Sequence, residues 1–451
     1  MNKRVERLLT ISALFVLVSC ASPEATSSFN EPSNNEEAYS PTLLRSPEDI
    51  AHMKNSTVMG TTSYLAFKEK MRDFSSRLSA SYINYDNKNN TICSPLSIEL
   101  CLGLAFYATA NETREEIENA FGIDYETFNY YYKAYFDEIL MENKDFEGNI
   151  RSRISLTNSL WISNDYDVVT KGLDDLKNDY YCYSYETDFQ NHNQESNDAI
   201  EDFINEQTHG LIDPELEFNV NTYLVLLNTL YLKDIWNEAG EPIDNAPSSY
   251  RFLNSNGEYS TKALLNGYYK DVKSYKGNNY TSCYTSTYDN IKILFMKPDD
   301  GYHVKDIFTA SNIKEATTMY LYRGIDEEKK ERYQTKVIFP EFNAESDLSI
   351  TEMLYKDFGI HQIFDESCDF SNLSTDNDLY CSDCHHIAKL EVNKKGIEGA
   401  AVTYMAMEGK AGAPDEYKEI KETFVVDKEF GYVVLNGSSN IIFSGIITNI
   451  D

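Results

Sequence analysis

The sequence predicts a mixed α+β fold built as one large domain. Helical periodicity, as in residues 64–78, alternates along the chain with apolar strand runs such as residues 223–232. A third observation is that no linker, internal repeat or low-complexity segment interrupts the chain after residue 56. Residues 56–451 are long enough for two or three domains, but without a visible boundary we expect a single one.

The first two helices are predicted from periodicity and from their end signals. Apolar residues lie on one helical face across residues 64–78. The next helix runs through apolar sequence to Ala108. Pro95 suits its first turn, and the hydroxyl of Ser94 can cap its N-terminus.

Two further helices follow from similar signals. Thr113 and Glu116 have the spacing of a capping box, so we expect them to open a short helix that ends at Gly122. Residues 198–210 show another helical pattern, in which Gly210 lies just past the end of the helix.

Strands are predicted at residues 155–163, 223–232, 291–296 and 336–339. The run 223–232 is apolar on both faces and is interrupted only at Asn228 and the following threonine, so it predicts a strand buried on both sides. Because a buried asparagine has to be hydrogen-bonded, we expect partners for the Asn228 side chain.

The first twenty residues predict an export signal. Three basic residues precede an apolar run over residues 8–18 that is too short to span a bilayer. Leu17-Val18-Ser19-Cys20 resembles a bacterial lipobox, in which Cys20 receives lipid and becomes the mature N-terminus; ordinary secretory cleavage near Ala21 is the alternative. We therefore expect a lipoprotein signal peptide at residues 1–19 and an exported protein, lipid-anchored at the outer face of the cell membrane.

The next segment and the overall charge restrict the partners. Residues 20–55 are rich in Ser, Asn, Glu and Pro, which predicts a flexible tether before a folded domain at residues 56–451. The formal net charge of −33, from 40 Lys and Arg against 73 Asp and Glu, argues against nucleic acid and against direct docking on anionic lipid. Membrane contact is thus expected only through Cys20.

The cysteines do not predict a disulfide framework. Apart from Cys20 there are seven, an odd number without regular spacing; Cys93 and Cys101 lie in apolar context and are predicted to be buried thiols. Cys381-Ser382-Asp383-Cys384-His385 matches a haem-attachment pattern and, with His386, allows a metal clip, but short motifs need a supporting fold. A disulfide or a pair of free thiols is the preferred interpretation, so neither a cofactor nor a metal is predicted.

The most informative segment is residues 389–410. It begins as a strand, in which Leu390 and Val392 alternate with charged neighbours. After Gly396 comes a run of small side chains at residues 399–403, which is too poor in apolar area to hold itself in a core. Such side chains can nevertheless slide between two strands of an existing sheet. The segment can therefore be either an exposed loop or an additional strand.

Motifs in a consistent order resemble the serpin family over residues 60–450. The small-residue run after Gly396 resembles the hinge of the family's reactive loop, and Leu226 to Trp236 is similar to its Val-Asn-x-x-Tyr-Phe-Lys-Gly-x-Trp strand. Further matches are Asn90 to Ile98, Thr113 to Ile117, Asn158 to Trp161, Ile200 to Ile212, Phe339 to Phe342, Phe358 to Ile360, Cys368 to Ser371 and the two C-terminal strands. The resemblance implies a serpin fold of about three β-sheets surrounded by about eight or nine helices, with an exposed reactive loop.

The resemblance also implies a suicide inhibitor, in which a serine or cysteine protease cleaves the loop and is trapped as an acyl-enzyme while the loop inserts into the main sheet. Counting from Gly396 places the reactive bond at Lys410-Ala411, and a basic residue there fits trypsin-like proteases. Because the segment after Lys410 is longer than in typical relatives, Lys418-Glu419 and Met407-Glu408 remain alternatives. The implied loop hinge comprises Gly396, Ile397, Glu398, Gly399, Ala400, Ala401, Val402 and Thr403.

Four polar residues occupy positions that resemble the family's shutter, the cluster that controls sheet opening: Ser94, Ser97, Asn228 and His386. The alternative is that these are separate, satisfied polar groups of the core. Two departures from the family pattern bear on inhibition, since Lys394 stands where Glu is usual and Ile397 where a smaller residue, Thr or Val is usual.

Motifs for an enzyme are missing from the sequence, including Gly-x-Ser-x-Gly, His-Glu-x-x-His and phosphate-binding glycine loops. The resemblance thus implies a protease inhibitor, which we expect to be a monomer that acts outside the cell. The alternative is a non-inhibitory protein with the same fold that serves as a binding or structural module on the cell surface.

Overall fold

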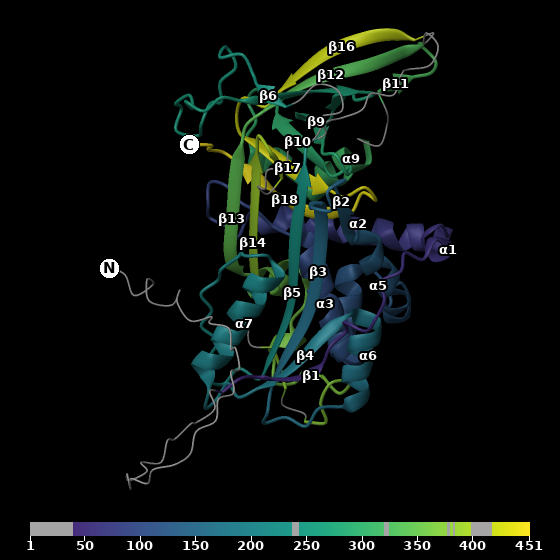
Figure 1. The fold of residues 1–451 in the computed structure, drawn as a ribbon, viewed down its shortest axis with the longest axis vertical. Helices are drawn as coiled ribbons and strands as arrows, with labels where there is room; N and C mark the ends of the chain where they lie inside the picture. The colour runs from purple at the N-terminus through teal and green to yellow at the C-terminus, as the bar shows by residue number, and fades with distance from the viewer. Residues whose placement is uncertain (1–38, 237–242, 320–323, 377–378, 382–383, 398–416) are drawn as a thin grey trace, which may run out of the picture. The chain divides into compact units, whose positions relative to one another are not determined.

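The computed structural model describes residues 39–236, 243–319, 324–376, 379–381, 384–397 and 417–451 (Figure 1). Within these residues the strands form three sheets and the helices pack around them. The α+β class and the three sheets expected from the sequence are confirmed. The predicted signal peptide, Cys20, and residues 398–403 and 410–411 lie outside the described residues.

The main sheet has eight strands in the described part of the chain, in the order β1, β4, β3, β5, β15, β14, β13, with β2 paired to β3. The predicted run 223–232 forms β5, which lies in the middle of this sheet. The strand bounds are β1 Thr42–Arg45, β2 Met141–Lys144, β3 Ile150–Ser163, β4 Cys182–Thr187, β5 Leu224–Ile235, β13 Phe342–Ser349, β14 His385–Asn393 and β15 Gly396–Ile397.

The second and third sheets have five strands each. The second is almost entirely buried at its C-terminal hairpin, and its bounds are β8 Tyr275–Lys276, β9 Tyr280–Ser286, β10 Lys292–Pro298, β17 Phe430–Leu435 and β18 Ile441–Ile447. The third sheet contains β6 Asp244–Asn245, β7 Leu265–Lys270, β11 Ile325–Asp326, β12 Glu331–Phe339 and β16 Lys418–Val425. Its strand β16 runs parallel to β12 and follows the predicted reactive loop in the chain.

Ten α-helices occur in the described residues, more than the eight or nine expected, because α1 and α8 are single turns. None of these helices is both long enough and apolar enough to cross a membrane. The bounds are α1 Ser56–Met59, α2 Thr62–Tyr82, α3 Pro95–Ala108, α4 Asn111–Phe121, α5 Tyr125–Ile139, α6 Thr170–Tyr180, α7 Asn193–Gln207, α8 Val304–Ile307, α9 Ala310–Met319 and α10 Thr351–Phe358, with a 3-10 turn at Gln362–Phe364.

The predicted helix ends are right at α3 and only half right at α4. At α3 the Ser97 N–H donates to the Ser94 hydroxyl at 3.2 Å, and Pro95 is the first helical residue. Helix α4 ends as expected, with Gly122 in the left-handed conformation. The capping box expected at Thr113 is wrong, because α4 begins earlier and the Thr113 hydroxyl contacts the distant Gln362 side chain and the Asp369 N–H.

The folded unit begins at Tyr39, well before the boundary at residue 56 that composition indicated. Strand β1 lies inside the segment expected to be a tether and pairs antiparallel with the edge strand β4. Side-chain contacts hold it there: Arg45 contacts Asp174 at 2.7 Å, and His52 contacts Asp137 at 2.9 Å. The described part of the tether is therefore an added edge strand and its continuation along the domain.

The two faces of the main sheet are covered differently. Helix α7 packs on one face through an apolar cluster that includes Ile200, Phe203 and Trp161. Helix α3 packs behind β5 on the other face, within the largest hydrophobic core. A strand in the middle of this sheet is therefore shielded from water on both sides, as the apolar sequence of β5 requires.

Candidate functional site

The site lies between the central strands β5 and β14, where the two-residue strand β15 is wedged at one end of the gap. Gly396 pairs with Ile235, and Ile397 pairs with both Asp234 and Val392. Ile397 is fully buried. The first two residues of the predicted hinge are thus already part of the main sheet.

Gly396 is required by its surroundings at this point. Its φ angle is +154°, and a Cβ atom added there would lie 2.2 Å from the backbone oxygen of Asp234. No side chain fits at that distance, so the close approach of β15 to β5 depends on glycine.

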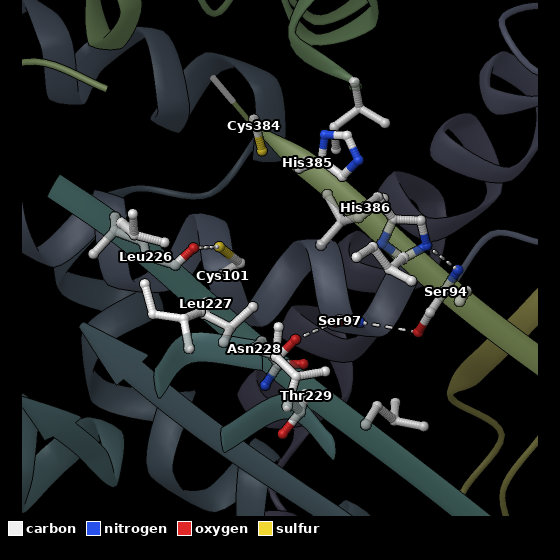
Figure 2. A pocket seen from close by; sticks show the side chains of 18 of the residues that line it. Ser94, Ser97, Cys101, Leu226, Leu227, Asn228, Thr229, Cys384, His385 and His386 are labelled. Atoms are coloured by element: carbon white, nitrogen blue, oxygen red, sulfur yellow. Dashed lines mark hydrogen bonds between the residues drawn. The ribbon is translucent and has the colours of Figure 1, made fainter. Parts of the chain in front are cut away.

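Beyond β15 the gap continues as a cavity of about 110 Å³ between β5 and β14. In the described part of the chain no ladder of hydrogen bonds joins β5 directly to β14. The cavity is lined mostly by apolar side chains from both covering helices and both strands, among them Ile98, Leu102, Ile200, Ile204, Leu226 and Ala388 (Figure 2). The cavity is therefore a mostly apolar slot between the two strands.

The four predicted shutter residues come together at this cavity (Figure 2). The Ser94 backbone N–H donates to Nε2 of His386 at 3.0 Å, and the Ser94 hydroxyl donates to the carbonyl of Ile442 at 2.8 Å. The Ser97 hydroxyl donates to the backbone carbonyl of Asn228 at 3.1 Å. The N-terminus of α3 is therefore bonded to β14, β5 and β18 at once.

His386 is held in its neutral form. Burial lowers its pKa to about 4 from the ordinary 6.5, and the nearby His385 acts in the same direction. A neutral ring can accept the Ser94 N–H at Nε2, whereas a protonated ring cannot. The edge of the ring also packs against Tyr82, with centroids 5.6 Å apart.

In the side chain of Asn228, the amide nitrogen has a hydrogen-bond partner and the amide oxygen has none among the described residues. Its Nδ2 donates to Oδ1 of Asn158 at 2.9 Å, and Nδ2 of Asn158 donates to the Tyr132 hydroxyl at 2.9 Å. The Oδ1 of Asn228 and the hydroxyl of Thr229, both buried at the cavity, have no hydrogen-bond partner among the described residues. Sequence reasoning predicted partners for Asn228 and found Asn158 only as a family motif, since nothing local joins two residues 70 positions apart.

Asp234 is a site residue that sequence reasoning missed. It is fully buried where β15 enters the sheet, and its carboxylate accepts from the Thr287 hydroxyl and, at 3.1 Å, from the Asp289 N–H. Burial, followed by the charge of Asp289, raises its pKa to about 7. A signal was present in the sequence, because the family pattern has glycine after the lysine of this strand and the chain has Asp234.

The cysteine motif at 381–385 does not gather into a metal site in the described residues. No group of three or more His, Cys, Asp or Glu side chains suited to a metal occurs there, and residues 382–383 lie outside them. His386 is occupied by Ser94. Of the predicted buried thiols, Cys93 is fully buried and Cys101 half-buried, with its Sγ 3.3 Å from the carbonyl of Leu226.

Several predicted residues cannot be placed. Lys410 and Ala411, the alternative bond Met407-Glu408, Cys20, and the hinge from Glu398 to Thr403 lie outside the described residues. The other alternative, Lys418-Glu419, lies at the start of β16 and is paired with β12. A bond inside a paired strand is poorly placed for a protease active site.

Comparison with known proteins agrees with this geometry. Residues 69–450 match the family model described as Serpin (serine protease inhibitor). The chain is 25% identical over 381 residues to Iripin-8 of Ixodes ricinus, covering 80% of this chain and 88% of that protein. It is 24% identical over 379 residues to leukocyte elastase inhibitor A of Rattus norvegicus, covering 79% and 92%.

A solved structure shows the same fold. The native state of the thermophilic serpin tengpin superposes with a TM-score of 0.68 at 21% identity, covering 85% of this chain and 94% of tengpin. The family model spans residues 69–450, which is most of the chain. This chain belongs to the serpin family.

Proposed function

We propose that this protein is a suicide inhibitor of trypsin-like serine proteases, which it traps by inserting its cleaved reactive loop into the main sheet. The family consists generally of protease inhibitors. The observation that carries the proposal is the register of β15, because this strand starts an insertion that the slot between β5 and β14 can continue.

Extending that register assigns a place to each following residue. Ile397 lies opposite Asp234 and Val392, so six residues later Thr403 would lie between Asn228 and His386. Side chains alternate between faces along a strand, so Thr403 would point to the same buried face as Ile397. In the extended register, the last residue of the predicted hinge would therefore lie between two residues of the predicted shutter.

The unsatisfied Asn228 oxygen fits this proposal. In the uncleaved protein Oδ1 of Asn228 is buried and lacks a donor among the described residues. The hydroxyl of an inserted Thr403 would supply one at the right position. Leaving such a group without a partner costs about 1–3 kcal/mol, which insertion would recover.

The energy of insertion is large enough to trap a protease. A central strand forms main-chain hydrogen bonds with both neighbours, each worth about 0.5–1.5 kcal/mol net. Insertion along the slot as far as residue 404 therefore yields on the order of 10 kcal/mol, enough to offset distortion of a protease active site. Insertion of the reactive loop in serpins is itself a known example of a transition that releases stored strain.

We further propose Lys410-Ala411 as the reactive bond and Cys20 as a lipidated residue that anchors the protein outside the cell. The basic side chain of Lys410 supports a trypsin-like target, and the family count from Gly396 supports its position. The pairing of Lys418 and Glu419 in β16 supports Lys410 over that alternative.

The test is incubation of the protein with trypsin, followed by denaturing electrophoresis and N-terminal sequencing of the released fragment. We expect an SDS-resistant covalent complex and a fragment that begins at Ala411. Cleavage without such a complex, and without a rise in melting temperature, would instead indicate the non-inhibitory binding or structural module.

A further inference from the structure

One face of the third sheet carries a row of lysines, which is unusual in a chain of net charge −33. The register places Lys421 of β16, Gln334 of β12 and Lys270 of β7 side by side. Two residues further along β12, and therefore on the same face, Lys336 lies between Thr423 of β16 and Tyr268 of β7. We call Lys270, Lys336 and Lys421 the lysine face.

This face is open to solvent. Lys270 and Lys421 are exposed, Lys336 is half-buried, and Tyr268 beside it is 40% exposed. The Lys336 ammonium lies 5.2 Å from the Tyr268 ring centroid. Residues of the opposite face, such as Val337 and Phe424, are buried, so the sheet presents the lysine face outward.

The positive charge of the face is largely uncompensated. No ion pair joins Lys270, Lys336 or Lys421 to any carboxylate of the described chain, although many surface lysines elsewhere are paired. Glu419 lies next to Arg332 in the register, and Asp271, which follows Lys270, is paired with Arg332 at 2.7 Å. Asp244, at the far edge on β6, is already paired with Lys394 at 3.0 Å.

The lysine face also follows the predicted reactive loop closely in the sequence. Strand β16 begins at Lys418, directly after the loop segment, and Lys421 lies only a few residues further along it. Neighbouring strands are about 4.8 Å apart, so Lys421 and Lys270 are separated by about 10 Å across β12. A protease bound at the loop would bring part of its own surface against this face.

We infer that the lysine face is a secondary docking surface for an acidic patch on the target protease, next to its active site. The inference rests on the proposed function and narrows the partner to a trypsin-like protease with a negatively charged rim. Attraction between the two surfaces raises the rate of encounter and leaves the trapping chemistry unchanged.

The test compares two proteases that share a specificity pocket and differ in surface charge, anionic and cationic trypsin. The variant is Lys270→Glu, Lys336→Glu and Lys421→Glu combined. The matched control reverses Lys54, Lys70 and Lys305, which are exposed, lie outside the third sheet and have no ion pair among the described residues. Association rates are measured at low and high salt, together with equilibrium binding to anionic trypsin whose catalytic serine is alanine.

With anionic trypsin, the variant is expected to associate about tenfold more slowly than the wild type at low salt, and the difference should vanish at high salt. The matched control, with the same net charge, should behave like the wild type. Equal rates for variant and control, or an unchanged affinity for the inactive trypsin, would overturn the inference. Retention of the proteins on a heparin column is measured as well. If the variant loses retention while its association rates with trypsin are unchanged, the inference is also overturned, and the face is assigned to an anionic polysaccharide.

The two proposals fail in different ways. If the lysine face is correct and trapping is wrong, the variant still loses affinity for inactive anionic trypsin while no SDS-resistant complex forms with any protein. If trapping is correct and the face is wrong, every protein forms the complex at the same rate.

Discussion

The substitution Thr403→Arg addresses the insertion mechanism directly. The register of β15 would place residue 403 on the buried face between Asn228 and His386. An arginine there has to bring its charge into a slot whose described lining contains no carboxylate. The penalty for burying an unpaired ion is several kcal/mol, so insertion should stop before this residue.

The magnitude follows from the strand length. Complete insertion adds residues 398–404 and is worth on the order of 10 kcal/mol, whereas a strand that stops at residue 402 adds five of these seven residues and keeps about 7 kcal/mol. In urea titrations, cleavage should therefore stabilise the wild type by on the order of 10 kcal/mol and Thr403→Arg by about 7 kcal/mol or less. The uncleaved variant should be as stable as the wild type, because insertion follows cleavage.

The inhibition assay supplies the second measurement. Thr403→Arg should be cleaved by trypsin as a substrate, with little SDS-resistant complex, whereas the control Thr403→Ser keeps a small hydroxylated side chain and should inhibit normally. If Thr403→Arg traps trypsin as efficiently as the wild type and gains the same stability on cleavage, residue 403 does not enter the slot and the extended register is wrong.

Four other predictions concern the residues around the slot. Ser94→Ala removes a helix cap and a bond to the Ile442 carbonyl, so it should cost about 2 kcal/mol in urea unfolding, against about 1 kcal/mol for Ser97→Ala, which removes one bond. Equal losses would contradict this. The pKa of His386 is lowered from 6.5 to about 4, so the unfolded chain takes up the proton first; the contribution of His386 to stability, measured as the difference between wild type and His386→Gln, should fall by about 3 kcal/mol between pH 6.5 and 4, and a constant difference would refute this. The pKa of Asp234 is raised from 3.8 to about 7, so its contribution is complete below pH 3.8 and should be lost, by about 4 kcal/mol, as the pH rises to 7; an unchanged pH profile in Asp234→Asn would refute this. Gly396→Ala should destabilise the uncleaved protein and shift its thermal midpoint downward, because the added Cβ meets the Asp234 oxygen at 2.2 Å; an unaltered midpoint would mean that β15 is not held against β5.

Sequence signals gave correct predictions where the interaction involves residues close together in the chain. Ser94 and Pro95 start α3 as predicted, because a cap acts within one helical turn. The buried strand β5 was predicted because a continuous apolar run of this length is typical of a strand in a sheet that is covered on both faces. The four residues that family motifs predicted as a shutter line one cavity in the structure, and their role in sheet opening stays a prediction.

The features that the sequence analysis predicted wrongly or missed have a common physical cause, because each depends on a partner that is distant in the sequence. Thr113 has the spacing of a cap, but its hydroxyl is taken by groups about 250 residues away. Residues 39–55 have the composition of a tether, yet the open edge of β4 offers β1 a hydrogen-bonding partner that composition does not reveal. The lysine face requires the register of three strands, which cannot be read from one segment.

Strand β1 lies at the opposite end of the main sheet from the start of the predicted reactive loop. It pairs with β4 at Tyr185 and Glu186, alongside the Leu224 end of β5, whereas the loop leaves the sheet at the Ile235 end, about 35 Å away along the strand. In the proposed anchored form, the chain that leads to Cys20 would therefore join the domain at the end of the main sheet opposite to the end where insertion of the loop begins.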